Sequence, residues 1–326
     1  MKEKIRVALI YKNNYNYFDP NHFDQTTSDF FLTSLQKHPR LEMLYFPSDN
    51  NFDATKIKGK CDVVLLANNH TDATPENIHG IKELGVPVVS RIGDPHNAMK
   101  YDQVSYHDQW NITCYFGTIP ESYFYKFYPN RFRYETVIFG LEPSRYQNLK
   151  PFKDRIKNRI LNSGATGNLK IGSRVINTIL NPRKSGLYFY KLRTLCNKLS
   201  CVDYMGIRGS QYPNVDYPTY LSQYRSAIAA TTYYPTQKYW EIPAAGCLTF
   251  IESTEINDCS YLGFIDNETA IFINKKNYKE KFENFLTDPD NPKWEEIAIK
   301  GRQHVFSNLS NDQASNSLVK LLSELI

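Results

Sequence analysis

The sequence predicts an α/β protein with two lobes, each built on a parallel β-sheet. The chain has 326 residues, which is enough for two domains of ordinary size. Short apolar runs alternate with stretches of helical spacing, and this alternation is the signature of βα units. It stops once, between residues 141 and 157, where prolines, aromatic residues and charges show no clear period, and then resumes. We therefore expect two domains, 1–148 and 149–326.

The composition is that of a globular protein without membrane-spanning segments. Hydrophobic residues make up 41% of the chain and charged residues 22%, and no apolar run approaches the length of a membrane span. The apolar run near the N-terminus is short and interrupted, so it is expected to be a strand, not a signal peptide. Six scattered cysteines without metal-site spacing predict reduced thiols. We expect a cytoplasmic protein.

The net charge of +5 is compatible with three kinds of partner. These are a phosphorylated small ligand, an anionic membrane surface and nucleic acid. The basic residues are dispersed, and no nucleic-acid-binding motif is visible, so nucleic acid is the weakest of the three.

Six apolar runs in the first half are expected to form strands. Two of the intervening stretches have helical spacing, and the second opens with Pro75 and closes with Gly85, as helices often do. The expected strands begin at Ile5, Leu41, Asp62, Val86, Ile112 and Glu135, and the expected helices cover 28–38 and 75–85. Together they predict one Rossmann-like lobe.

The second half repeats the alternation and predicts a second Rossmann-like lobe. Its strands are expected to begin at Asn158, Cys201, Ser226, Cys247 and Thr269, with helices over 188–199, 217–225 and 238–246 and closing helices over 278–288, 294–308 and 313–326. We expect the two lobes to face each other across a cleft, with the C-terminal helices packing across the lobes. Because ligands of open α/β sheets bind at the carboxyl ends of the strands, the active site is expected between the lobes.

Glu241 is the first candidate for chemistry, because it lies near the start of an expected short helix. Free N–H groups at a helix start favour a diphosphate, and a carboxylate beside them can accept two hydrogen bonds from a ribose diol. Pro243 is expected in the first helical turn, and the small residues after it let the helix lie close to its sheet. The alternative is an ordinary first-turn acid that stabilises its own helix.

The segment around Glu241 resembles a known family. "PTQKYWEIPAAGCLTFIES", followed by "YLGFIDNETAIFI", "IAIKGRQHVFSN" and "SLVKLLSEL", is similar to the C-terminal half of GT-B glycosyltransferases, particularly the group 1 and CgeB-like branch. The family pattern is roughly a basic residue, an aromatic residue, Glu, two residues, Ala, one residue and Gly, followed by a strand. The similarity covers about the last third of the chain, and the first half fits the fold without a matching motif.

The resemblance implies a nucleotide-sugar site in the second lobe. Glu241 would bind the ribose hydroxyls and Lys238 would lie near the phosphates. One glycine-bearing turn would approach the diphosphate and another would hold the base, and an arginine would clamp the phosphates, with Arg174 as a further candidate. The implied donor site comprises Glu241, Lys238, Gly164, Ala165, Arg193, Gly206, Ile207, Arg208, Tyr239 and Gly246. Many retaining members carry a second acid eight positions before the ribose carboxylate, whereas this chain has Tyr233 there.

Acceptor and base candidates lie in the first lobe. Asp94 and His96 follow an expected strand, so either could take a proton from the acceptor hydroxyl, although a capping aspartate in a proline turn is the alternative. His22 and Asp24, in an aromatic loop after the first strand, are further acceptor-binding candidates. No metal site is expected: "DPD" at 288–290 superficially resembles the acidic triplet with which other glycosyltransferases hold a divalent ion, but it lies where a helix should end.

The aromatic run over 122–135 has two interpretations. Its rings alternate with Lys126, Arg131 and Arg133 and could touch a membrane surface or a lipid-linked acceptor. Packing inside the protein is the commoner fate of such rings.

These features predict a metal-independent glycosyltransferase that needs no cofactor. It would move a sugar from a nucleotide-diphosphate-sugar donor to a hydroxyl of a glycan or glycolipid acceptor, in the cytoplasm or at the inner face of the membrane. A nucleotide-sugar epimerase on the same fold and a non-catalytic nucleotide-sugar- or glycan-binding protein remain alternatives.

Overall fold

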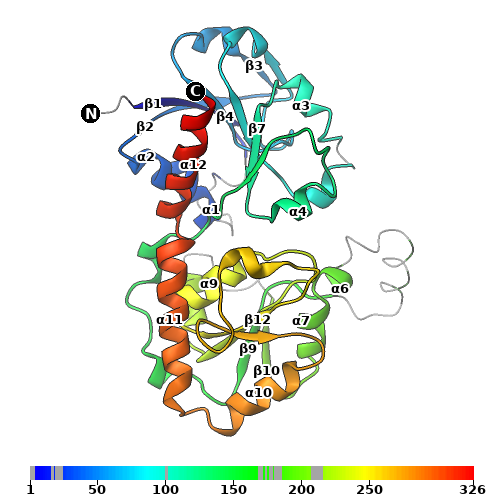
Figure 1. Ribbon diagram of the computed structural model, residues 1–326, viewed down its shortest axis with the longest axis vertical. Coiled ribbons are helices and arrows are strands. Elements are labelled where there is room, and N and C mark those ends of the chain that lie inside the picture. Colours follow the sequence, from blue (N-terminus) through cyan, green and yellow to red (C-terminus); the bar gives the residue numbers. More distant parts are fainter. Residues whose placement is uncertain are drawn as a thin grey trace. The chain divides into compact units, whose positions relative to one another are not determined.

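The chain divides into two units in the computed structural model, which describes residues 4–15, 18, 25–99, 102–167, 172, 175, 179, 186–206 and 216–326. The first unit comprises Met1–Gly140 and Asn311–Ile326, and the second comprises Leu141–Ser310 (Figure 1). The division after Gly140 comes before the boundary at residue 148 that the sequence predicted. The last helix belongs to the first unit because its apolar face packs into the core of that unit.

The first unit contains a six-stranded parallel sheet in the order β2-β1-β4-β6-β7-β8. All six strands predicted from the apolar runs form. The order reverses between β1 and β4, and the carboxyl ends of these two strands therefore form a topological switch point. The strands are β1 (Ile5–Lys12), β2 (Leu41–Ser48), β4 (Val63–Leu66), β6 (Val88–Arg91), β7 (Cys114–Gly117) and β8 (Tyr134–Thr136).

Helices cover the first sheet, and α12 is the longest of them in this unit (Figure 1). A π-helical turn joins α1 to α2, and its buried Phe30 and Phe31 share one core with Leu318 and Leu322 of α12. The helices are α1 (Gln25–Asp29), α2 (Leu35–Lys37), α3 (Tyr106–Gln109), α4 (Glu121–Phe124) and α12 (Asn311–Leu325).

The helix predicted over residues 75–85 is wrong. The segment forms β5 (Asn77–His79), which pairs with β3 (Asn51–Asp53), and then a 3-10 turn over Lys82–Leu84. Ile78 pairs with Phe52 and is buried, so pairing with a distant strand prevails over the local helical spacing. Gly85 does end the turn, with φ +68°.

The second unit contains a five-stranded parallel sheet in the order β10-β9-β11-β12-β13. Its switch point lies between β9 and β11. The strands are β9 (Ile160–Ser163), β10 (Val202–Met205), β11 (Ser226–Ala229), β12 (Leu248–Glu252) and β13 (Ile271–Ile273), and the helices are α6 (Gly186–Phe189), α7 (Lys191–Cys196), α8 (Tyr217–Leu221), α9 (Lys238–Ala244), α10 (Tyr278–Thr287) and α11 (Pro292–Asn308). The predicted α/β architecture with parallel sheets is confirmed, and so are the predicted closing helices.

Helix α9, which carries Glu241, packs tightly into this unit. Pro243 lies one residue before the end of α9, so its predicted place in the first turn is wrong. A proline is tolerated there because the helix is short and its end is closed by other bonds, from Ala245 N to the Glu241 carbonyl (3.1 Å) and from Gly246 N to the Pro243 carbonyl (2.8 Å). A Cβ at Gly301 of α11 would lie 3.7 Å from the Pro243 Cβ, so the two helices approach closely.

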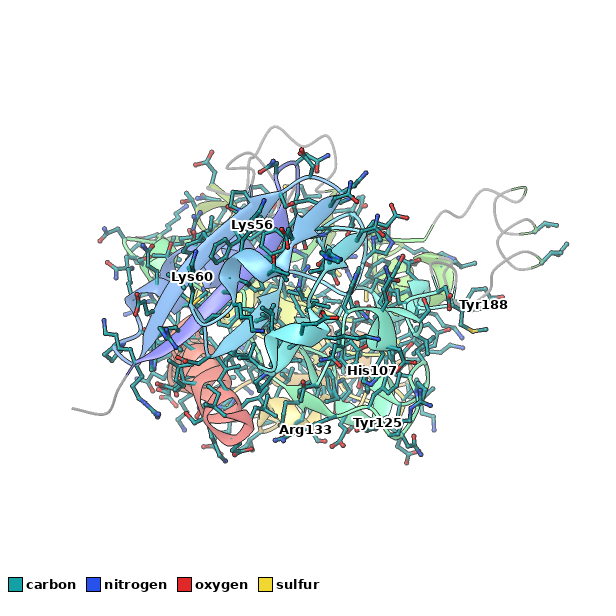
Figure 2. All side chains as sticks on the ribbon, turned by 90° about the horizontal axis from the view of Figure 1, so that it is seen from above. Lys56, Lys60, His107, Tyr125, Arg133 and Tyr188 are labelled. Carbon is teal, nitrogen blue, oxygen red and sulfur yellow. The ribbon has the colours of Figure 1, made fainter. Side chains whose placement is uncertain are left out.

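The aromatic run over 122–135 packs mainly inside the first unit. Phe124 stacks on Tyr128 and on Tyr134, with ring centroids 4.5 and 4.3 Å apart. Arg133, near the end of the run, is labelled in Figure 2 together with Tyr125 of the same run. Nη2 of Arg133 lies 2.9 Å from Oε2 of Glu324 in α12. Most rings of the run are therefore core residues. No helix in the described part of the chain has both the length and the apolar character needed to cross a bilayer.

Candidate functional site

The switch point of the second sheet is formed around Gly164, directly after β9. Gly164 has φ +101°, which favours glycine, and its N–H donates to the Met205 carbonyl at 2.8 Å. A Cβ at this position would lie 2.8 Å from Nη2 of Arg193 and 2.9 Å from Cε of Lys238. The glycine therefore lets two cationic side chains approach the backbone at the end of the strand.

Arg193 of α7 is a buried cation whose side chain is held by neutral groups. It is 2% exposed. Its Nε donates to Oδ1 of Asn162 at 3.0 Å, its Nη2 donates to the Ser163 carbonyl, and its guanidinium lies 5.1 Å from the centre of the Tyr190 ring. Burial lowers its pKa from the usual value. Because no carboxylate in the described part of the chain pairs with Arg193, its charge is available to an anion.

Lys238 begins α9 and joins this arginine at the switch point. Its Nζ donates to the Tyr217 hydroxyl at 2.6 Å and lies 3.7 Å from Oε2 of Glu241. The Tyr217 hydroxyl in turn lies 2.7 Å from Oγ of Ser163. Burial raises the pKa of Tyr217 well above its usual value, and the charge of Glu241 raises it further, so the phenol remains protonated at neutral pH.

Glu241 is a buried carboxylate and not a solvent-exposed first-turn acid. It is 7% exposed and lies one helical turn after Lys238 on α9. The hydroxyl of Tyr146, on the segment that opens the second unit, is fully buried and has no hydrogen-bond partner in the described part of the chain. Burial and then the charge of Glu241 raise the pKa of Tyr146 well above its usual value. The carboxylate thus lies beside Lys238, and its charge acts on the two buried phenols of Tyr146 and Tyr217.

The predicted donor residues are only partly brought together. Gly206 directly follows Met205, which pairs with Ser163, and Ala165 directly follows Gly164, so both lie at the carboxyl edge of the sheet. Gly246 lies at the opposite end of α9 from Lys238, where Nη1 of Arg155 donates to its carbonyl at 2.8 Å. Ile207, Arg208 and Arg174 lie outside the described residues.

Tyr239 organises two loops at the same edge of the sheet. Its buried hydroxyl accepts from Thr231 N (3.2 Å) and Asn257 Nδ2 (3.1 Å) and donates to the Glu252 carbonyl (3.1 Å). These bonds tie the loop after β11 to the loop after β12. Through these hydrogen bonds, Tyr239 positions the two loops.

The sequence did not single out Tyr217, although its hydroxyl links Ser163 to Lys238. It follows Asp216 and precedes a proline at the start of α8, a local signal of a helix start and not of a site. Only the fold brings this ring against the end of β9.

In the first unit, Asp94 and His96 lie together after β6. Asp94 caps a 3-10 turn over Pro95–Asn97, where its Oδ1 accepts from His96 N and lies 3.0 Å from Nδ1 of the same residue. Nε2 of His96 lies 2.7 Å from the Tyr123 hydroxyl. His96 is buried, whereas the Asp94 side chain is 51% exposed. His22 and Asp24 lie outside the described residues.

In the Asp-Pro-Asp segment at 288–290, Asp290 makes ion pairs with basic side chains. Oδ1 of Asp290 lies 2.9 Å from Nη1 of Arg225, and its other oxygen pairs with Lys157. These cations and the hydrogen bonds that they donate lower the pKa of Asp290. Within the described residues, no group of three or more His, Cys, Asp or Glu side chains is arranged to hold a metal ion.

One family model matches a part of the chain that includes Lys238 and Glu241. Residues 203–320 match the family model described as glycosyl transferase-like. Over these residues the chain is similar to that family. The family prediction is confirmed at this level, and the match does not address the CgeB-like branch. No curated protein sequence significantly matches the chain.

Solved structures with a similar fold include several glycosyltransferases. The chain is similar to Anabaena Alr3699/HepE, solved in complex with UDP and glucose, with a TM-score of 0.56, 10% identity and coverage of 98% of this chain and 100% of that one. The chain is also similar to a glycosyltransferase from Rickettsia africae, with a TM-score of 0.58, 10% identity and coverage of 99% of this chain and 98% of that one. A third similar structure is an alpha-glucosyltransferase, solved in complex with UDP and a 13-mer DNA containing an HMU base. Its TM-score is 0.58, its identity is 9%, and the match covers 98% of this chain and 100% of that one. The predicted GT-B fold is confirmed.

Proposed function

We propose that this protein is a glycosyltransferase that takes its sugar from a nucleoside-diphosphate donor and passes it to a hydroxyl acceptor. The observation that carries the proposal is the buried guanidinium of Arg193, which lies at a sheet switch point beside Gly164 and Lys238 and has no carboxylate partner among the residues that the structure describes. A diphosphate supplies the negative charge that such a site needs, and guanidinium groups suit phosphate oxygens.

The other residues of the cluster have complementary roles in this proposal. Glu241 accepts hydrogen bonds from the ribose diol, and the turn that begins at Gly206 holds the base. Arg193 and Lys238 neutralise the departing diphosphate, so the transfer needs no metal ion. In the first unit, Asp94 is the base that accepts the proton of the acceptor hydroxyl.

The surroundings of the reaction are part of the proposal. We infer that the acceptor is a glycan or glycolipid precursor and that the protein works in the cytoplasm or at the inner face of the membrane. Exposed Arg131 and Arg133, at the rim of the aromatic segment, could meet an anionic lipid surface. Sedimentation with anionic vesicles tests this part separately.

Nucleotide binding and product analysis test the enzyme proposal. UDP, GDP, ADP and dTDP are screened at millimolar concentration for a rise in the melting temperature, since a ligand that binds only the folded state stabilises it. Glu241→Gln and Lys238→Gln should each reduce the rise, whereas Lys279→Gln, at an exposed position on α10, should not. No rise with any nucleotide would remove the basis for the donor site.

Incubation with the matching nucleotide sugar then separates the candidate activities. Transfer requires an acceptor and releases nucleoside diphosphate, whereas an epimerase converts the nucleotide sugar without an acceptor. A protein that binds the nucleotide sugar but gives neither product would be a binding protein on this fold.

A further inference from the structure

The proposed diphosphate site contains a carboxylate of its own, although a carboxylate repels phosphate. Glu241 lies three positions after Lys238 on α9, and its Oε2 is 3.7 Å from Nζ of Lys238. The Lys238 side chain is 13% exposed and the Glu241 side chain 9%. Water therefore screens the pair only weakly, and the carboxylate offsets much of the charge that Lys238 brings to the site.

The hydrogen bond that fixes Lys238 goes to Tyr217, whereas Lys238 and Glu241 attract each other as charges. Nζ donates to the Tyr217 hydroxyl at 2.6 Å and lies 4.2 Å from the centre of the Tyr217 ring. The distance of 3.7 Å between Nζ and Oε2 exceeds the usual length of a hydrogen bond, about 2.7–3.2 Å. A ligand can therefore separate the carboxylate from the ammonium while Tyr217 still holds the lysine.

Arg193 adds a second cation at the same place. A Cβ at Gly164 would lie 2.8 Å from Nη2 of Arg193 and 2.9 Å from Cε of Lys238, so both side chains lie against one backbone position. Arg193 is 2% exposed, and no ion pair joins it to a carboxylate among the described residues. The site thus combines two cations with one carboxylate.

An inorganic anion gains less from this arrangement than a nucleotide does. Pyrophosphate can take Lys238 from Glu241, but it leaves a buried carboxylate without its cation and beside a new negative charge, which is costly. A nucleoside diphosphate also brings a ribose diol, whose two hydroxyl groups can donate charge-assisted hydrogen bonds to the released carboxylate. Only a ligand with both groups leaves every charge compensated.

We propose that Glu241 excludes inorganic phosphate and pyrophosphate from this site by competing for Lys238, and that it admits a diphosphate that carries a ribose diol. This inference rests on the proposed function, because it assigns a selectivity to the same donor site. Glu241 then lowers the affinity for the phosphate part of the ligand and raises the affinity for the whole nucleotide. The two effects have opposite signs, so one substitution separates them.

Calorimetric titration of the full-length protein with pyrophosphate tests the proposal, at constant ionic strength and with EDTA so that no metal ion alters the charge of the probe. Glu241→Gln should bind pyrophosphate about tenfold more tightly than the wild type, because the competing charge is gone. The same variant should bind the nucleoside diphosphate that stabilises the wild type most about five- to tenfold more weakly, because an amide accepts less strongly from the diol than a carboxylate does.

Glu280→Gln is the matched control. Glu280 also lies in the first turn of a helix of the second unit, α10, but at an exposed position. The substitution removes the same charge from the protein and should leave both affinities unchanged.

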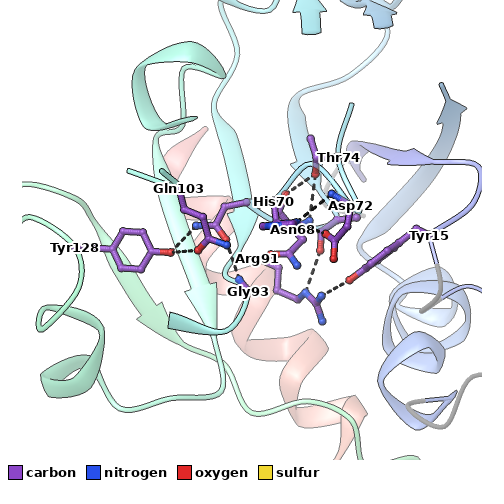
Figure 3. Close-up of polar contacts among 11 residues, drawn as sticks. Tyr15, Asn68, His70, Asp72, Thr74, Arg91, Gly93, Gln103 and Tyr128 are labelled. Carbon is purple, nitrogen blue, oxygen red and sulfur yellow. Dashed lines mark hydrogen bonds and ion pairs between the residues drawn. The ribbon is translucent and has the colours of Figure 1, made fainter. Parts of the chain in front are cut away.

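The double variant Glu241→Gln/Lys238→Gln locates the bound pyrophosphate. The switch point of the first unit also holds a buried arginine, Arg91, whose side chain donates to the Ala67 carbonyl at 3.0 Å and to the Tyr15 hydroxyl (Figure 3). Pyrophosphate bound there would not respond to substitutions on α9. At the proposed site, the double variant should lose the gain of Glu241→Gln, because the released cation is absent.

Glu241→Asp separates the charge of the side chain from its length. It keeps the carboxylate, so the pyrophosphate affinity should stay within about twofold of the wild type. The shorter side chain no longer reaches the diol, so the nucleotide affinity should fall about five- to tenfold. If loss of the thermal transition shows that Glu241→Gln does not fold, this variant decides.

The proposal is wrong if Glu241→Gln binds pyrophosphate no more tightly than the wild type, or if Glu280→Gln gains as much. It is also wrong if the double variant keeps the gain, or if Glu241→Asp binds the nucleotide as the wild type does. Failure of the donor proposal would be seen separately, as the absence of nucleotide binding to the wild type.

Discussion

Gly164 and Arg193 lie so close together that residue 164 has no room for a side chain. The position of a Gly164 Cβ falls 2.8 Å from Nη2 of Arg193, and Arg193 is held in place by Asn162 and the Ser163 carbonyl. The close approach brings a buried cation and the backbone N–H groups that follow β9 to one point. A strand end of this kind can hold a phosphate from two sides.

Gly164→Ala should therefore damage both stability and nucleotide binding. The positive φ strains any other residue, and the added methyl group meets a guanidinium that cannot move away, so we expect a loss of about 1–3 kcal/mol in unfolding free energy. Nucleoside-diphosphate affinity should fall at least about tenfold. Calorimetric titration and urea unfolding measure the two effects.

Gly85→Ala is the matched control for this substitution. Gly85 also has a positive φ, of +68°, but no heavy atom of the described residues would lie within 4 Å of an added Cβ. It should lose stability from backbone strain alone and keep full nucleotide affinity. Equal affinity losses in the two variants would contradict a site at Gly164.

Tyr217→Phe tests the link between Ser163 and Lys238. The substitution keeps the ring but removes the hydroxyl that accepts from Nζ of Lys238. We expect about 1 kcal/mol lower stability and a several-fold change in nucleotide affinity, because the ammonium loses its anchor. Tyr125→Phe removes a hydroxyl that donates to the Phe132 carbonyl in the first unit and should affect stability alone.

The sequence predicted both sheets because each strand is a local apolar run. It failed over residues 75–85, where helical spacing and a proline start coincide with a strand whose partner, around Phe52, lies far away in the chain. The same limit explains Pro243: local rules place it in a first turn, but the closing bonds beyond it allow it near the end of α9.

The site was predictable only where the residues lie in one contiguous motif. Lys238 and Glu241 are three positions apart on α9, so a sequence pattern contains both. Tyr217 reaches the end of β9 through the topology of the sheet. No local pattern distinguishes Asn68, whose Oδ1 has no hydrogen-bond partner among the described residues, from Asn69 beside it, whose side chain makes two hydrogen bonds. Side-chain satisfaction is a property of the folded chain.

Glu252→Gln should remove a pH dependence of stability from the second unit. Glu252 ends β12, is 7% exposed and has one carboxyl oxygen without a partner in the described part of the chain. Burial raises the pKa of its carboxyl to about 8, although the charge of Lys191 acts in the opposite direction. The folded state therefore holds a proton that the unfolded state has already released above its ordinary pKa.

Because the pKa of Glu252 is higher in the folded state than in the unfolded state, its contribution to stability decreases as the pH rises. This stabilising contribution is complete below the unfolded pKa and is lost as the pH rises toward about 8. Urea unfolding between pH 5 and pH 8 should show the wild type losing stability relative to Glu252→Gln, by at most about 1.4 kcal/mol per pH unit. Glu255→Gln serves as the control at an exposed position on the following loop. A constant difference between wild type and Glu252→Gln would mean that the carboxyl is already ionised in the folded protein.

Asp94→Asn separates the two members of the candidate base pair. The Asp94 carboxylate is half exposed, whereas both ring nitrogens of His96 are engaged, Nδ1 by Asp94 and Nε2 by the Tyr123 hydroxyl. An aspartate that accepts from Nδ1–H fixes the tautomer in which Nε2 accepts from Tyr123. The geometry therefore favours Asp94 as the proton acceptor and His96 as the residue that orients it.

Removal of a general base typically costs about 10²- to 10⁴-fold in rate, so Asp94→Asn should lower kcat in that range without changing nucleotide affinity. His96→Gln should lower kcat less and also lower the melting temperature, because a buried ring with two partners is lost. Asp108→Asn, at an exposed position on α3, should behave as the wild type. If His96→Gln lost more activity than Asp94→Asn while remaining folded, the histidine would be the base, and the Asp94 carboxylate would be its orienting partner.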